Sequence, residues 1–129
     1  MGEGTLSDTS LQPLRVLFCI GISQNFFELP RDEMGAVFEA FKVAFSNWEE
    51  RFGVEVLGTL DDDRVQVGQS PAGWPFTSYV LANAPDLDAV VKVCDQLRST
   101  PVGDGLLWRY ARIETRIGRP TFTEVGAHA

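Results

Sequence analysis

The chain has 129 residues, 44% of them hydrophobic and 22% charged, which is the length and composition of one globular domain with a real core. Its formal net charge of −7 argues against nucleic acid or an anionic membrane as a partner, because both are bound by clustered Lys and Arg. Two cysteines without metal-ligand spacing indicate neither a disulfide framework nor a thiolate metal centre. With no signal-peptide pattern and no apolar run long enough to span a membrane, we expect a cytoplasmic protein.

The first half of the chain predicts strand, helix and strand. Residues 1–13 are rich in Gly, Ser, Thr and acidic side chains, and we expect them to form a flexible lead-in. Residues 14–23 are apolar on both faces, which is typical of a strand in the middle of a sheet. Residues 30–52 predict an amphipathic helix that ends at Gly53, and a strand over 54–60 follows. The helix carries a wide apolar stripe that we assign to the core: Met34, Val37, Phe38, Phe41, Phe45, Trp48 and Phe52.

The second half repeats this order. A loop over 68–75 precedes a strand over 76–82, and residues 83–86 cap a helix over 87–98. The apolar face of that helix is expected to be Leu87, Val90, Val91, Cys94 and Leu97. A last strand over 108–117 follows, and the domain is expected to cover 14–120, with 121–129 as a tail. The doubled unit predicts an α+β, ferredoxin-like βαββαβ fold with an antiparallel sheet, whose bare face usually needs a second subunit.

The last strand, the acidic run and one loop tryptophan are the segments most suggestive of chemistry. Alternation along 108–117 places Trp108, Tyr110, Arg112 and Glu114 on one face, as a subunit interface or as the wall of a ligand pocket. The run 61–63 is either a solvated turn beside an arginine or the source of one general base, and its spacing does not suit a metal. Trp74 either covers the sheet edge or acts as a lid on a planar ligand. The lone histidine, His128, lies next to the C-terminus, which disfavours a nucleophile–histidine arrangement.

Five short phrases, taken together, are more specific than any one of them. They are RVLFCIG at 15–21, NFF at 25–27, LGTLDDD at 57–63, GWP at 73–75 and LWRY at 107–110. As a set they resemble a family of small bacterial proteins of the IacB type, found in operons for indole-3-acetate catabolism. The broader likeness is to the dimeric α+β barrel superfamily. The resemblance implies a homodimer whose two sheets meet, with a cavity between sheet and helices in each subunit.

These patterns lead to one functional hypothesis and one alternative. The hypothesis is a homodimer that binds a small aromatic or indolic acid, with cofactor-free proton transfer, such as a dehydration or an isomerisation, as the reaction. The alternative is a non-enzymatic accessory protein whose open sheet face serves dimerisation or docking to an oxygenase. No metal or cofactor is expected. The candidate base is Asp62, the candidate hydrogen-bond donor is Tyr110 or Tyr79, and Arg112 would hold a ligand carboxylate. The predicted ligand-binding residues are Asn25, Trp74, Tyr79, Trp108 and Arg112.

Overall fold

A computed structural model describes residues 13–69 and 72–123, so the predictions for residues 1–12, for the last six residues of the tail and for His128 lie outside the described residues. The chain forms a four-stranded antiparallel sheet in the order β2-β3-β1-β6, a short two-stranded ribbon and several helices. The predicted α+β class is confirmed, and this arrangement is compatible with a ferredoxin-like fold. The elements are β1 (Leu14–Ile22), α2 (Gln24–Phe27), α3 (Arg31–Ala44), α4 (Trp48–Phe52), β2 (Glu55–Asp61), β3 (Ser78–Ala84), α5 (Leu87–Cys94), α6 (Gln96–Ser99), β4 (Pro101–Val102), β5 (Gly105–Leu106), the 3₁₀ turn η1 (Leu107–Arg109) and β6 (Ala111–Gly118).

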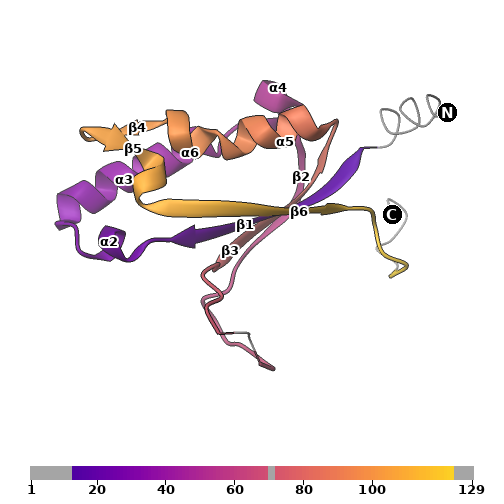
Figure 1. Cartoon of the computed structure of the whole chain (residues 1–129), viewed down its shortest axis with the longest axis horizontal. Coiled ribbons are helices and arrows are strands. Elements are labelled where there is room, and N and C mark those ends of the chain that lie inside the picture. The colour runs from indigo at the N-terminus through magenta and orange to yellow at the C-terminus, as the bar shows by residue number, and fades with distance from the viewer. Residues whose placement is uncertain (1–12, 70–71, 124–129) are drawn as a thin grey trace.

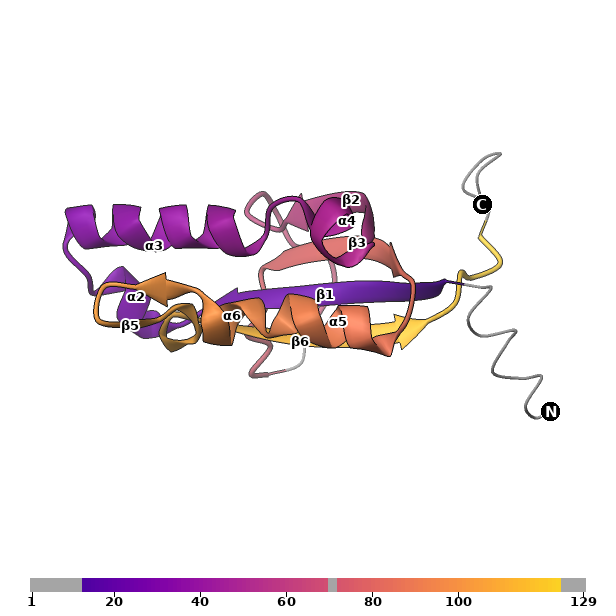
Figure 2. The same ribbon diagram turned by 90° about the horizontal axis from the view of Figure 1, so that it is seen from above.

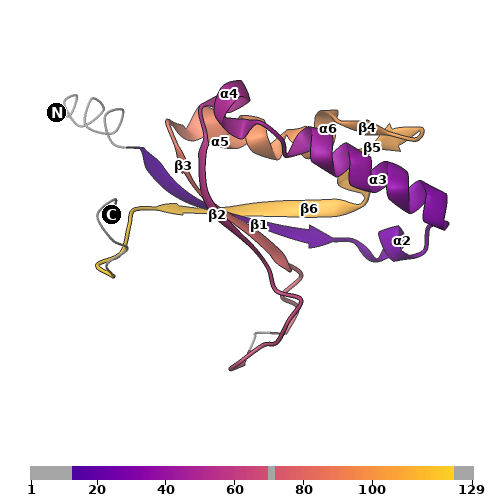
Figure 3. The same cartoon turned by 180° about the vertical axis from the view of Figure 1, so that it is seen from behind.

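The helices lie on one face of the sheet, while the connection between β2 and β3 extends away from the other face (Figure 1, Figure 3). Seen from above, α3 and the α5–α6 pair lie next to each other over the strands (Figure 2). β1 is central, as its two apolar faces predict, because Cys19 pairs with Tyr79 of β3 on one side and Glu114 of β6 on the other. In β2 the register shifts between Val56 and Gly58, which marks a β-bulge.

The predicted long helix over 30–52 is wrong in one respect, because the structure breaks it into α3 and α4. Asn47 has a left-handed backbone (φ 55°), a conformation that asparagine tolerates better than most residues. Arg51 Nη1 closes the break by donating to carbonyl oxygens of Val43, Ala44 and Ser46 at 3.0, 3.2 and 2.9 Å, which satisfies carbonyls at the end of α3. The break directs Trp48 into the core.

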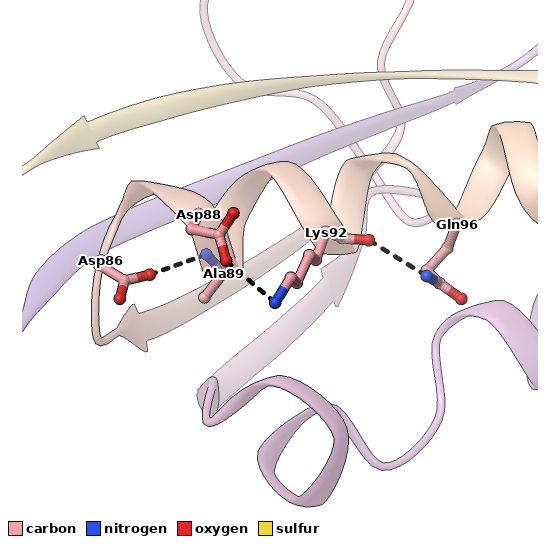
Figure 4. Close-up of polar contacts among 5 residues, drawn as sticks. All are labelled: Asp86, Asp88, Ala89, Lys92 and Gln96. Atoms are coloured by element: carbon pink, nitrogen blue, oxygen red, sulfur yellow. Dashed lines mark hydrogen bonds and ion pairs between the residues drawn. The ribbon is translucent and has the colours of Figure 1, made fainter.

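The second helix begins as predicted, but the structure divides it into α5 and α6 and buries only part of the predicted face. Val90 and Leu97 are buried as predicted. The Asp86 carboxylate accepts a hydrogen bond from the backbone N–H of Ala89 at 2.9 Å and caps α5 (Figure 4). Leu87 and Val91, predicted to be buried, are 60% and 53% exposed. The buried face is Ala89, Val90 and Val93, because these side chains share one core cluster with the small alanines of β3 and with Val16 and Phe18 of β1.

The last strand starts later than predicted, at Ala111. Before it, β4 and β5 form a small ribbon that turns at Gly103 (φ 59°). Leu107 is fully buried, and its N–H donates to the Thr100 carbonyl at 2.9 Å, which holds the η1 turn against the core. Trp108 and Tyr110 therefore do not share a strand face with Arg112 and Glu114, and that prediction is wrong.

Two hydrophobic clusters form the core on the helix side of the sheet. The first is built around Phe18 and Trp48, whose ring centroids lie 5.0 Å apart. The second lies at the end of the sheet near α2 and contains Phe26, Val37 and Leu107. Phe45 and Ile113 pack against both clusters. A hollow remains between α3 and the sheet, although the apolar stripe predicted for the helix over 30–52 was expected to pack into the core there.

Candidate functional site

The predicted site residues do not meet in one pocket. Asp62, Trp74 and Tyr79 come together at the connection between β2 and β3, around a hollow of about 460 Å³. Trp108 and Arg112 come together at the β6 edge of the sheet, around a second hollow of about 600 Å³. We call these the hairpin pocket and the edge pocket.

In the hairpin pocket, one tyrosine hydroxyl links the other two residues. Trp74 Nε1 donates a hydrogen bond to the Tyr79 hydroxyl oxygen at 2.8 Å. The same hydroxyl lies 3.4 Å from Asp62 Oδ2 and 3.1 Å from the Phe76 carbonyl oxygen, so its proton has two competing acceptors. The Trp74 ring packs edge-on against the ring of Phe76, which is 3% exposed. Trp74 thus covers a buried side chain while its indole N–H is occupied.

A close backbone approach fixes this segment on the open face of the sheet. The Pro75 carbonyl oxygen lies 2.2 Å from the position that a Cβ atom on Gly21 would occupy. Glycine is therefore required in β1 at this position for the segment to lie against the strand. The Thr77 N–H donates to the Ile20 carbonyl at 3.0 Å, and the Asp62 N–H donates to the Thr77 carbonyl at 2.9 Å. These bonds hold Asp62 at a defined place at the end of β2.

The edge pocket combines an exposed indole with two guanidinium groups. Arg98 Cζ lies 5.8 Å from the centroid of the Trp108 ring, whose residue is 57% exposed. Arg112 lines the same pocket and makes no ion pair within the described part of the chain, whereas the neighbouring Glu114 pairs with Arg116 at 2.9 Å. Arg112 and Trp108 thus line one pocket, but the guanidinium group near the Trp108 ring is that of Arg98, and the role of Arg112 in holding a ligand carboxylate stays a prediction.

Asn25 and Tyr110 hold the turn that precedes β6. Asn25 Nδ2 donates to the Arg109 carbonyl at 3.1 Å, and the Ser23 N–H donates to the Tyr110 carbonyl at 2.8 Å. Tyr110 is partly buried against the second core cluster. Both residues join the end of β1 to the η1 turn, and they line neither of the two pockets above.

A third cavity, whose phenylalanine lining was not predicted from the sequence, lies between α2, α3 and the sheet. It measures about 600 Å³, and we call it the phenylalanine cavity because five phenylalanines line it. Phe26 is buried, whereas Phe27 and Phe38 are 58% and 56% exposed and mark its opening. Ile20 and Ile22 of β1 complete the apolar wall. The five phenylalanines are Phe26, Phe27, Phe38, Phe41 and Phe45.

One end of the phenylalanine cavity is polar and acidic. The carboxylate residues Asp61, Asp62 and Asp63 line it together with Thr77 and Ser78, and no Lys or Arg is among its lining residues in the described chain. Asp62 also lines the hairpin pocket, so the two hollows adjoin at this residue. Of the predicted site residues, Asp62 is the one that reaches this cavity within the described ranges.

The run 61–63 carries no metal-binding geometry, because no group of three or more His, Cys, Asp or Glu side chains in the described residues is placed to hold an ion.

The thiols of Cys19 and Cys94 have ordinary structural surroundings. Burial raises the pKa of the Cys19 thiol, with the nearby Arg116 opposing and Glu114 adding to the effect. Burial, and then Asp95, raise the pKa of the Cys94 thiol, which lines the edge pocket. Both shifts keep the thiols protonated and weakly nucleophilic at neutral pH.

Comparison with known proteins adds no relative: no protein-family model matches the chain, and no curated protein matches it significantly. The class of protein that the fold and cavities define is an α+β protein with one helix-covered sheet face and an aromatic cavity beneath α3. The resemblance to the IacB-type family stays a prediction. Within the described residues, every helix is too short or too polar to cross a membrane.

Proposed function

We propose that this protein binds a small aromatic metabolite in the phenylalanine cavity. The observation that carries the proposal is the cavity itself, an opening of about 600 Å³ with aromatic and aliphatic walls and one polar end. Cavities of this size and composition are typical of sites for small organic ligands, in which apolar walls supply affinity and a few polar groups fix orientation. The position between sheet and helices is also the one that the family resemblance implies.

The exposed rings favour a ligand over simple core packing. Phe27 and Phe38 each pack edge-on against Phe26, at centroid distances of 5.2 and 5.4 Å, and leave more than half of their own surface in water. Such clustered exposure lowers solubility unless something covers it. A planar ring inserted here would make the edge-to-face and offset contacts that aromatic side chains prefer.

Isothermal titration calorimetry with indole tests this proposal. We expect saturable binding to the wild-type protein and several-fold weaker binding to Phe38→Ala, because one aromatic wall is removed while the backbone of α3 stays helical. Phe122→Ala is the matched control, since Phe122 is fully exposed and does not line the cavity. Equal affinity in wild type and Phe38→Ala would place the ligand elsewhere, and absence of binding to any of the proteins would refute the proposal.

For a reaction, we propose cofactor-free proton transfer with Asp62 as the base. Asp62 borders the cavity, and the Tyr79 hydroxyl, which lies 3.4 Å from Asp62 Oδ2 in the adjoining hairpin pocket, supports Tyr79 as its hydrogen-bond donor. Tyr110, the other predicted donor, packs against the second core cluster. The test is exchange of the CH₂ protons next to the carbonyl of indole-3-acetone for deuterium from D₂O, followed by NMR, because a carboxylate base can remove a proton at that carbon and the enolate then takes up deuterium. We expect Asp62→Asn to abolish incorporation and Tyr110→Phe to preserve it; the reverse pattern would overturn this assignment.

A second candidate function, association through the open sheet face, rests on a different observation. Leu17, Leu60 and Leu81 line a shallow apolar groove of about 420 Å³ on that face, and Leu60 is 60% exposed. We propose that a second copy of the chain covers it. Light scattering coupled to gel filtration should report a dimer that Leu60→Glu dissociates. Leu87→Glu is the control, because Leu87 is equally exposed but lies on α5. A monomeric wild type at high concentration would contradict this proposal.

A further inference from the structure

The phenylalanine cavity has a strongly one-sided charge. Its polar end is formed by the end of β2, where Asp61 pairs in register with Ser78 and the Asp62 N–H is bonded to the Thr77 carbonyl. These bonds hold the acidic end against the sheet at the floor of the cavity. Asp61 and Asp63 make no ion pair within the described residues. Arg64 follows directly but is not among the residues that line the cavity.

This charge bears on which aromatic ligand fits. A bound carboxylate would lie close to like charges without a cationic partner in the cavity wall, and like charges repel. An ammonium group would meet carboxylates at the same place, where the Ser78 hydroxyl can also accept a hydrogen bond. The phenylalanine rings add a favourable surface for a cation. The predicted carboxylate-binding residue, Arg112, lines the edge pocket, which shares no lining residue with this cavity.

We propose that the ligand of the phenylalanine cavity is an aromatic amine, with its ring among Phe27, Phe38 and Phe41 and its ammonium group at Asp61–Asp63. The inference rests on the proposed binding function and specifies its ligand class. It departs from the aromatic acid expected from the sequence, because the cavity that suits an aromatic ring has carboxylates at its polar end.

A matched series of three indoles tests the proposal by calorimetry at low salt: tryptamine (cationic), 3-methylindole (neutral) and indole-3-acetate (anionic). We expect tryptamine to bind most tightly and indole-3-acetate to bind most weakly. Their dissociation constants should differ about tenfold or more, which is the effect expected from one or two exposed ion pairs. The preference should shrink in high salt, because the carboxylates are exposed and the interaction is screened.

Charge-removing variants identify the source of the preference. Asp61→Asn combined with Asp63→Asn should weaken tryptamine about tenfold while leaving 3-methylindole unchanged. Asp88→Asn is the control, because Asp88 is an exposed carboxylate of α5 that is paired with Lys92. Circular dichroism confirms that each variant is folded.

The outcomes separate this inference from the function on which it rests. If 3-methylindole binds and tryptamine binds no more tightly, the amine proposal is overturned and the aromatic site stands. If indole-3-acetate binds best and loses affinity in Arg112→Gln, the ligand is an acid in the edge pocket and the inference is wrong. If none of the three binds, the proposed function itself fails, and the inference fails with it.

Discussion

Replacing Gly21 by alanine tests how the β2–β3 connection lies on the open face. The added Cβ would lie 2.2 Å from the Pro75 carbonyl oxygen and 3.1 Å from its carbonyl carbon. Contacts under 3.0 Å are essentially never seen for real Cβ atoms, and the opposing atoms belong to backbone, which cannot rotate away. The segment must therefore move by about 1 Å, against the hydrogen bonds of Thr77 and Asp62 to the strands.

The expected magnitude follows from two opposing terms. Forcing extra atoms into a packed contact costs about 1–3 kcal/mol, while removing a glycine from the unfolded chain returns about 0.4–1 kcal/mol. We expect Gly21→Ala to lower the free energy of unfolding by about 1–2 kcal/mol. The assay is urea unfolding followed by circular dichroism, with tryptophan fluorescence as a second readout, because Trp74 belongs to the displaced segment.

Gly58→Ala is the matched control in the same sheet. No atom lies within 4 Å of a Cβ built on Gly58, and its φ is not positive. This variant should be neutral or up to about 1 kcal/mol more stable than the wild type. If Gly21→Ala unfolds at the same urea concentration as Gly58→Ala, the segment does not press on β1, and the described geometry of the hairpin pocket is wrong.

Three further predictions concern the scaffold. Asp86→Ala should cost about 1 kcal/mol of stability in urea unfolding, because the Ala89 N–H loses its acceptor. The control Asp88→Ala should cost under about 0.5 kcal/mol, because the ion pair of Asp88 with Lys92 is exposed. Equal losses in the two variants would contradict the role of Asp86 as the helix cap. Arg51→Ala should cost about 1–2 kcal/mol in urea unfolding, because the carbonyls of Val43, Ala44 and Ser46 lose their donor. Arg51→Lys should recover only part of this loss, because Arg51 also donates from Nη2 to the Gln96 side-chain oxygen and a single ammonium nitrogen cannot occupy both places; full recovery would refute that account. Cys19 is 1% exposed, and burial raises the pKa of its thiol above the usual 9.0, so it should resist iodoacetamide in the folded protein. The free energy of unfolding should fall as pH rises above about 9, because the unfolded chain then loses the proton that the folded chain keeps. Rapid alkylation under native conditions would contradict this account.

The central strand could be predicted because a strand in the middle of a sheet leaves a short, continuous apolar run in the sequence. β1 reads as apolar on both sides, and it does lie in the middle of the sheet. The cap at Asp86 was predictable from local chemistry alone. Other features depend on long-range contacts. The apolar stripe of 30–52 continues in phase through Asn47, so its periodicity does not reveal the break that Arg51 and the core stabilise.

The candidate site was harder to predict for a related reason. A stripe of phenylalanines has the same periodicity whether it fills a core or walls a cavity, and Phe38 and Phe41 were assigned to the core. What distinguishes the two is how far α3 stands from the sheet, which no local pattern records. The dense aromatic stripe next to an acidic run at the end of the following strand was the available signal. The prediction that Trp108 lies on the last strand was wrong because β4, β5 and the η1 turn occupy residues 101–109, so β6 begins only at Ala111.

The most direct test of the central claim is where an aromatic ligand binds. The measurement is the set of intermolecular nuclear Overhauser effects between isotope-labelled protein and unlabelled 3-methylindole. The account predicts contacts from the ligand ring to the rings of Phe38 and Phe41 and to the Ile20 methyl groups. Contacts confined to the Trp108 or Trp74 rings would place the ligand in the edge pocket or the hairpin pocket and would contradict the claim that the phenylalanine cavity is the binding site.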